Sequence, residues 1–167
     1  QVEALELDQL IHLDSQQLGA LTSAHIRMID PDEISGLSTR QVQSLHSAQI
    51  RALLTGQIAA LEATQIRALG STQFAAFSTS QIGALYHAHL PVLTTVQIAG
   101  LAPAQLTELP AEDVPALSTS QLRALSSAQL SALRTSQIAA LELDQLLSFS
   151  TAQLMGLTTG QIQALTE

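Results

Sequence analysis

One eight-residue repeat runs through the whole chain without a change of phase. Taking Gln1 as position 1 and stepping by eight gives twenty-one octads, of which seventeen begin with Gln. The four exceptions are His25, Glu33, His89 and Asp113. Position 2 is always apolar, and position 5 is Leu in all but three octads. A fixed internal period of this kind predicts a repeat architecture.

The period of eight argues against one long helix and against a β-strand. In an α-helix eight residues advance the pattern by about 80° beyond two full turns, so the apolar stripe would wind around the helix. In a strand, positions 2 and 5 would point to opposite faces. Gln, Ala and Leu also favour helix over strand. We therefore expect an all-α fold with one short helix in each octad.

The residues around each expected helix start support this interpretation. Ser118 followed three residues later by Gln121 is a capping-box sequence, in which Gln reaches back to the amide of the N-cap residue. Asp30-Pro31-Asp32-Glu33 places an acceptor at the N-cap, proline at the first helical position and acids in the first turn. Pro103 has the same place in its octad. Each helix should have about six residues and a length of roughly 9 Å.

Such helices need neighbours, because isolated helices shorter than about 12–15 residues are marginal in water. We expect an α-solenoid of about twenty-one stacked mini-helix repeats, with stability shared between adjacent repeats. No change of composition marks a boundary, so residues 1–167 are interpreted as a single uninterrupted array. The sequence opens on Gln at an octad boundary, and we expect it to be a segment of a longer repetitive protein.

Two prolines disturb the pattern. Pro91 and Pro115 follow the apolar residue at position 2, inside the expected helix, where proline removes an amide and biases the residue before it away from helical angles. We expect a distorted or 3₁₀ turn in these two octads.

The run Leu157-Thr-Thr-Gly-Gln-Ile-Gln-Ala-Leu165 resembles the Leu-Thr-Thr-Ala-Gln-Ile-x-Ala-Leu tracts of very large, repetitive bacterial proteins. Those proteins are loosely described as surface adhesins or haem-utilisation proteins, and the resemblance extends over all 167 residues. It implies a secreted or cell-surface array of bacterial origin. No haem-binding or catalytic residue is carried over by the resemblance.

Composition narrows the choice of partners. The net charge is −8, which disfavours nucleic acid and anionic membrane surfaces because both attract basic proteins. No apolar run is long enough to span a bilayer. The absence of Cys excludes disulfides and thiolate metal sites. We therefore predict no nucleic-acid partner and no membrane insertion.

Few residues suggest a chemical site. His87 and His89 have a spacing that can bind a metal from a strand, but two residues apart on a helix point away from each other, and His89 fills the slot of Gln. Asp30, Asp32 and Glu33 are oxygen donors of the kind that Ca²⁺ prefers, although no calcium-loop glycine accompanies them and the helix dipole explains all three.

Rows of Ser/Thr pairs would suit a sugar or ice surface, but their cap role already explains them. No nucleophile elbow, phosphate loop or zinc motif is present. We predict no catalytic, cofactor-binding or metal-binding residue, no cofactor and no enzymatic activity.

The favoured interpretation is a structural extracellular repeat protein, such as a fibre, stalk or adhesin shaft, that spans distance or polymerises. The alternative is a solenoid scaffold that binds a protein or a glycan on one face. The end octads keep apolar residues in the core slots, at Val2 and Leu5 and at Ile162 and Leu165. We expect an apolar stacking surface at each end, with the chain itself as the partner, by head-to-tail or lateral self-association.

The repeat also predicts how stability is distributed. Leu125 is expected in the core, so Leu125→Ala should cost about 2–5 kcal/mol. Gln121 is expected to serve only as a cap, so Gln121→Ala should cost nearer 1 kcal/mol, roughly the loss of a cap.

Overall fold

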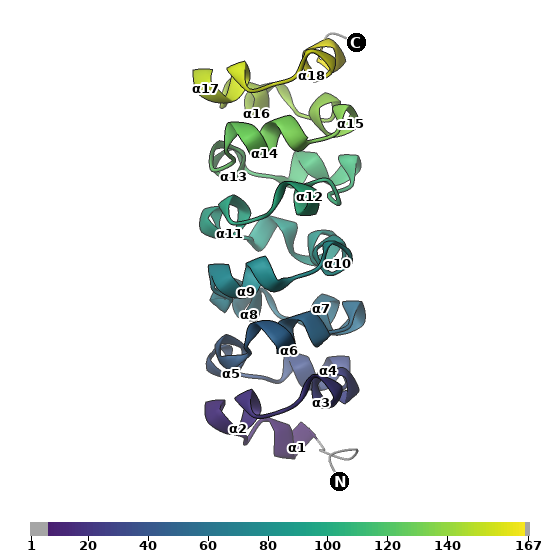
Figure 1. Cartoon of the computed structure of the whole chain (residues 1–167), viewed down its shortest axis with the longest axis vertical. Helices are drawn as coiled ribbons and strands as arrows, with labels where there is room; N and C mark the ends of the chain where they lie inside the picture. Colours follow the sequence, from purple (N-terminus) through teal and green to yellow (C-terminus); the bar gives the residue numbers. More distant parts are fainter. Residues whose placement is uncertain (1–6, 166–167) are drawn as a thin grey trace. The chain divides into compact units, whose positions relative to one another are not determined.

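The computed structural model describes residues 7–165, which belong to two compact units divided after Val92. Within residues 7–165 the regular elements are α-helices and 3₁₀ helices, and no strand is present. The expected all-α solenoid of short repeats is confirmed. Each unit is a stack of mini-helices separated by one or a few extended or turn residues (Figure 1).

The first unit contains ten α-helices and one 3₁₀ helix among its described residues. They are α1 (Leu7–Leu10), α2 (Ser15–Gly19), α3 (Ser23–Met28), α4 (Pro31–Ser35), α5 (Thr39–Ser44), α6 (Ser47–Ala52), α7 (Thr55–Ala60), α8 (Ala63–Ala68), α9 (Ser71–Ala76), α10 (Thr79–His89) and η1 (Leu90–Val92).

The second unit continues the same octad phase. Its described elements are α11 (Thr95–Ala99), α12 (Pro103–Leu106), η2 (Ala111–Ala116), α13 (Thr119–Arg123), α14 (Ser127–Ala132), α15 (Thr135–Ala139), α16 (Leu143–Leu147), α17 (Thr151–Met155) and α18 (Thr159–Ala164).

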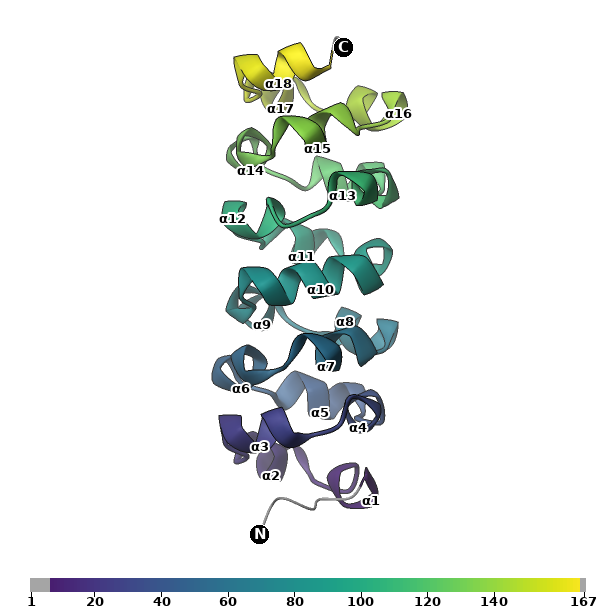
Figure 2. The ribbon, with the colours of Figure 1, turned by 90° about the vertical axis from the view of Figure 1, so that its right-hand side faces the viewer.

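Within each unit a helix packs against the helix three octads further along the chain. In the first unit α4 packs on α7 and α7 on α10, and in the second α14 packs on α17 and α15 on α18 (Figures 1 and 2). Hydrogen bonds between successive layers join residues 25 to 31 positions apart. One layer of the stack therefore takes about 28 residues, or three and a half octads, a value that the octad pattern alone left open.

The core follows the expected register. In α7 the position-2 residue Ile58 is fully buried, and Leu61 at position 5 is 3% exposed. Positions 2 and 5 are buried in the same way through the middle of both units. The two large aliphatic side chains of each octad therefore face the interior, and each layer covers the layer before it.

The two prolines act as expected, but one helix is longer than predicted. Pro91 lies in η1 and Pro115 in η2, which confirms 3₁₀ turns in both octads. The prediction of one helix per octad is wrong at α10, which continues for 11 residues through two octads. Tyr86 occupies the cap position there and is buried. A missing cap acceptor does not by itself explain the longer helix, because α7, α8 and α9 start after Leu54, Glu62 and Gly70 without a side-chain cap bond.

Two glycines give opposite predictions for substitution by alanine. A Cβ at Gly156 would lie 2.6 Å from Cβ and 3.2 Å from Cα of Ser127, whose hydroxyl donates to the Ala152 carbonyl at 2.9 Å. Gly156→Ala should therefore cost about 1–3 kcal/mol by overpacking α17 against α14. A Cβ at Gly83, within α10, meets no atom within 4 Å. Gly83→Ala should stabilise by about 0.5–1 kcal/mol in thermal unfolding, and equal shifts for the two variants would contradict this packing.

Candidate functional site

The most regularly repeated polar feature of the described residues is the buried Gln at position 1 of the octad. Gln57 on α7 is 1% exposed. Its Oε1 accepts the Leu54 N–H at 2.7 Å, at the start of its own helix. Its Nε2 donates to the carbonyls of Ile26 and Ile29, at 2.7 and 2.6 Å, at the end of α3 in the previous layer. One side-chain amide thus joins the beginning of one helix to the end of another.

We call this arrangement the amide bridge, and it recurs at eight-residue intervals in both units. In every case Oε1 accepts the amide of the residue three positions earlier, and Nε2 donates to at least one carbonyl 28 to 31 residues earlier. The bridging residues are Gln41, Gln49, Gln57, Gln65, Gln73 and Gln81 in the first unit, and Gln121, Gln129, Gln137, Gln145, Gln153 and Gln161 in the second.

The amide bridge solves a problem that short helices create. Each α-helix leaves four amides and four carbonyls without an internal partner, and in a helix of five or six residues these end groups are most of the backbone. Burying them unpaired would cost about 1–3 kcal/mol for each group. The Gln side chain provides an acceptor for one helix end and donors for the other, so polar groups at both ends are paired inside the stack.

The cap role predicted for Gln121 is confirmed, but it describes only half of the side chain. Ser118 Oγ accepts the Gln121 N–H at 3.2 Å, and Gln121 Oε1 accepts the Ser118 N–H at 2.7 Å. The donation from Gln121 Nε2 to the Leu93 carbonyl was not predicted. The sequence did contain a signal for this donation. A capping box accepts Glu as readily as Gln, yet Gln begins seventeen of the octads. Only the amide supplies a donor.

The C-terminal end of the second unit exposes part of the core. Leu130 and Ile138 at position 2 are fully buried, whereas the equivalent Leu154 is 41% and Ile162 46% exposed. Leu165 at position 5 is half-buried.

The N-terminal end of the first unit is of a different kind. Leu10 and Leu18 are fully buried there, and Gln17, in the bridging slot, is exposed. Val2 and Leu5, on which the expectation of an apolar surface rested, lie outside the described residues. Among residues 7–165 this end presents amide side chains, and the other end presents aliphatic ones.

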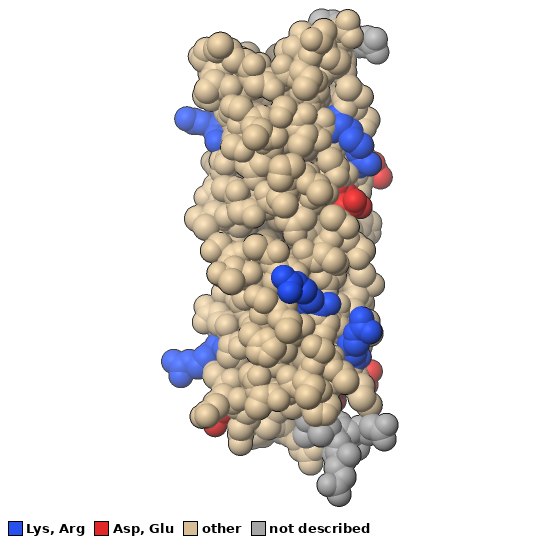
Figure 3. Space-filling model, in the orientation of Figure 1, with Lys and Arg blue, Asp and Glu red and all other residues tan. Residues whose placement is uncertain are grey.

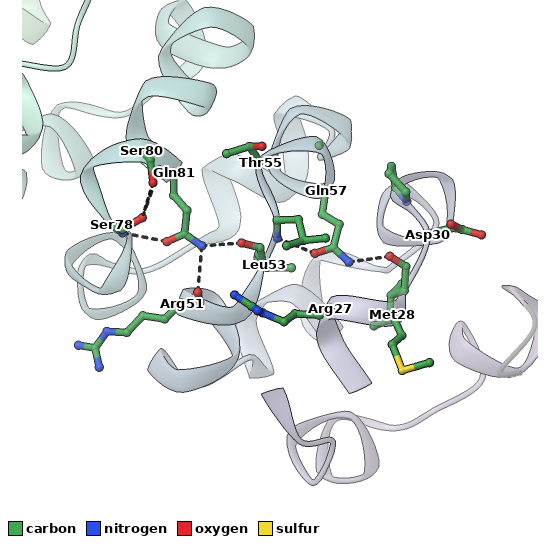
Figure 4. Close-up of a pocket in the computed structure, with 14 residues that line it drawn as sticks. Arg27, Met28, Asp30, Arg51, Leu53, Thr55, Gln57, Ser78, Ser80 and Gln81 are labelled. Atoms are coloured by element: carbon green, nitrogen blue, oxygen red, sulfur yellow. Dashed lines mark hydrogen bonds between the residues drawn. The ribbon is translucent and has the colours of Figure 1, made fainter. Parts of the chain in front are cut away.

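A concave surface in the first unit is the strongest candidate for ligand recognition. A cavity of about 630 Å³ spans three successive layers at the starts of α4, α7 and α10 (Figure 4). Arg27 and Arg51 lie beside it with Asp30, and among residues 7–165 neither arginine forms an ion pair. Gln57 and Gln81 line its floor, where their amides already serve the bridges.

The two histidines considered as metal ligands lie on one helix. His87 and His89 are both on α10, two residues apart, and His87 is exposed. The Nε2 atom of His89 is buried and has no hydrogen-bond partner in the described part of the chain. No group of three His, Asp or Glu residues that could bind a metal is present among residues 7–165.

The acidic cluster and the Ser/Thr rows lie at helix starts as we predicted, although the Asp30 side chain makes no cap hydrogen bond. Asp30 is the N-cap of α4, and Glu33 Oε2 accepts its N–H at 3.0 Å, with Asp32 beside them in the first turn. The hydroxyl at the N-cap accepts the amide of the residue three positions later in many octads. These hydroxyls belong to Thr22, Ser38, Ser78, Thr94, Ser118, Ser126, Ser150 and Thr158.

The visible surface is largely uncharged, with a few separated arginines and acids (Figure 3). Two arginine side chains donate hydrogen bonds to backbone carbonyls of the adjacent layer, Arg67 to that of Val92 and Arg134 to that of Leu109. No helix in the described range 7–165 has both the length and the apolar character needed to cross a bilayer.

Comparison with known families agrees with the octad architecture. The model of the ALTTAQ repeat matches residues 26–63, 50–87 and 109–143, which together are more than half of the chain. No curated protein matches the sequence. Both units contain matched segments, and each of these includes bridged octads. The chain belongs to the ALTTAQ repeat family.

Proposed function

We propose that this chain is a structural shaft, a fibre or stalk segment of a bacterial surface or secreted protein, whose work is to span distance or to polymerise end to end. The observation that supports the proposal most directly is the amide bridge. It makes each layer depend only on the layers beside it, so the number of octads can change while the cross-section stays constant. A non-catalytic role agrees with the absence of any inserted loop in the sequence.

The extracellular setting is part of this proposal and is supported by the sequence alone. The octads resemble the repeat tracts of very large bacterial surface proteins. The face shown in Figure 3 carries few charged groups, which also agrees with a spacer, because it offers few charges for partner selection.

The test is to lengthen the stack and measure it. One, two or three further octads copied from residues 39–62 would be inserted at the end of that segment, and particles imaged by electron microscopy. We expect the long dimension to grow by equal steps at constant width. A matched insertion of Gly and Ser residues should add flexible chain without such steps. Particles that become wider as well as longer when octads are added would refute the proposal of a shaft.

The cavity beside Arg27 and Arg51 supports a second candidate, a scaffold that binds an acidic glycan or protein segment on one face. Two unpaired guanidinium groups beside a recess can form bidentate bonds to carboxylate or sulfate groups. Heparin is a suitable probe. We expect Arg27→Ser with Arg51→Ser to reduce its binding at least about tenfold and the control Arg123→Ser to have little effect. Unchanged heparin binding by the double variant would exclude this face as the binding site.

A further inference from the structure

The recess beside Arg27 and Arg51 carries two large apolar side chains as well as two cations. Met28 is 52% exposed and Leu54 is 45% exposed, and both line the recess together with the arginines. Figure 4 shows Arg27 between Arg51 and Met28, with Asp30 beyond Met28. We call this surface the arginine recess (Arg27, Met28, Arg51, Leu54). It combines apolar contact area with positive charge.

The apolar side chain of Leu54 is not explained by the packing of its own chain. Leu54 is at the cap position of α7, where other octads often have Ser or Thr, and it makes no side-chain cap bond. The helix thereby loses the stability that a cap contributes. Burial within the chain recovers little of this loss, because almost half of the side chain stays exposed. A leucine here is suited to a contact outside the chain.

Helix α16 carries features that match the recess. Leu143 and Leu147 are one helical turn apart on the same face of α16, and they are 71% and 75% exposed. Glu142 and Asp144, on either side of Leu143, are exposed, and neither carboxylate forms an ion pair among residues 7–165. We call this surface the leucine ridge (Glu142, Leu143, Asp144, Leu147). It combines apolar contact area with negative charge.

The ridge is exposed because it lies on the side of the stack. Leu143 and Leu147 occupy positions 7 and 3 of the octad, and within residues 9–165 no residue at either position is buried. Helix α14 of the same unit has Ser127 and Ser131 at these two positions. The fold therefore does not require leucine at either place, and α16 adds apolar area to the lateral surface.

We propose that the leucine ridge of one chain binds the arginine recess of a second copy of this chain. The two leucines of the ridge contact the apolar side chains of the recess, and its two carboxylates pair with the two guanidinium groups. A second copy is the partner that both surfaces indicate, because each surface supplies the charge that complements the other.

This contact joins chains side by side. Ridge and recess are different surfaces, so the contact is heterologous and can continue from chain to chain. Only a few side chains meet, and we therefore expect weak association that decreases as salt is added. The inference goes beyond the proposed shaft, since a single stack spans distance without it. It also names the ridge, in place of a glycan, as the ligand of the arginine recess.

The test reverses the charges of one surface at a time. Arg27→Glu with Arg51→Glu gives the recess variant, and Glu142→Arg with Asp144→Arg gives the ridge variant. A third variant, Leu143→Ser with Leu147→Ser, gives α16 the two serines that α14 already has at these positions. It removes the apolar area of the ridge and keeps its charges.

The fold tolerates the arginines of the ridge variant, because Arg134 is the N-cap residue of α15 and Arg40 the second residue of α5. Each variant has a matched control at exposed residues outside both surfaces. The controls are Arg40→Glu with Arg123→Glu for the recess variant, Glu108→Arg with Glu112→Arg for the ridge variant, and Met155→Ser for the serine variant.

Sedimentation velocity at low salt, over a wide concentration range, gives the result. The unmodified chain and the three controls should form concentration-dependent oligomers, and each of the three test variants should weaken association at least about tenfold. Circular dichroism should show equal helix content in all seven proteins. An unmodified chain that stays monomeric at the highest concentration, or controls that weaken association as much as the test variants, would overturn the proposal.

Mixing the recess and ridge variants tests the pairing directly. The acidic ridge of the first meets the basic recess of the second, and the basic ridge of the second meets the acidic recess of the first. An equimolar mixture should therefore associate although neither variant does so alone. A mixture that stays monomeric would contradict the pairing of these two surfaces.

The shaft and the glycan candidate are tested separately from this contact. Failure of association would leave the length measurement on inserted octads unaffected. The ridge variant keeps Arg27 and Arg51, so it should bind heparin as the unmodified chain does. Heparin binding without self-association would remove the second copy as the ligand of the recess and leave the acidic glycan.

Discussion

Deleting residues 59–62 should destabilise the first unit more than deleting residues 55–62, although it removes half as many residues. The eight-residue deletion takes out one octad and keeps the phase, so Gln65 moves into the place of Gln57 and donates to the Ile26 and Ile29 carbonyls. The four-residue deletion shifts every later octad by half a repeat. The bridges of Gln65, Gln73 and Gln81 to carbonyls before the deletion are then out of register.

The shorter deletion can keep its register only by extruding residues 55–58 as a loop. In that arrangement helix α7 is lost. Closing a loop between packed helices also costs conformational entropy. We expect the four-residue deletion to be less stable than the eight-residue one by about 2 kcal/mol or more. Urea unfolding followed by circular dichroism measures the difference. Stability that falls simply with the number of residues removed would mean that the octad phase does not determine the packing.

The local part of this architecture could be read from the sequence. The spacing of positions 2 and 5 identified the core, and Ser118, Asp30 and Pro31 identified helix starts, because caps and apolar spacing act within one octad. Pro91 and Pro115 identified the 3₁₀ turns for the same reason. Each of these effects needs only neighbours within about one helical turn.

The contacts between layers could not be read in this way. A layer of 28 residues is three and a half octads, so a Gln meets carbonyls four octads earlier while its helix packs on a helix three octads away. Nothing inside one octad specifies that offset, since it depends on how short helices of this length and connection pack together. The long α10 was also missed.

The candidate sites show the same division. The cap role of Glu33 followed from its place after Asp30-Pro31-Asp32, and the structure confirms it. The cavity beside Arg27 and Arg51 was not predicted, because the two residues are brought together only when one layer packs on the next. The direction of the amide bridge could be recognised only once the donor and its acceptors were both known.

Gln57→Glu should cost about 3–5 kcal/mol in the free energy of unfolding, even though a capping box accepts Glu and Gln equally. The introduced carboxylate can still accept the Leu54 N–H, so a side chain that served only as a cap would tolerate the change. The structure predicts a loss because Nε2 donates to two buried carbonyls, at 2.7 and 2.6 Å, and the carboxylate would place a negative charge against both oxygens.

The matched control for this substitution is Gln43→Glu, at an exposed position of α5 in the same unit, which should change stability by less than about 0.5 kcal/mol. Gln57→Met separates the lost donor from the added charge, because it keeps the volume and removes only the hydrogen bonds. We expect it to lie between the other two variants in urea unfolding. The penalty of Gln57→Glu should also narrow at low pH, where the protonated carboxyl regains one donor for a carbonyl. A cost near 1 kcal/mol or less, roughly the value of one cap, would mean that the bridge between layers contributes little, and that the apolar residues at positions 2 and 5 alone hold the stack together.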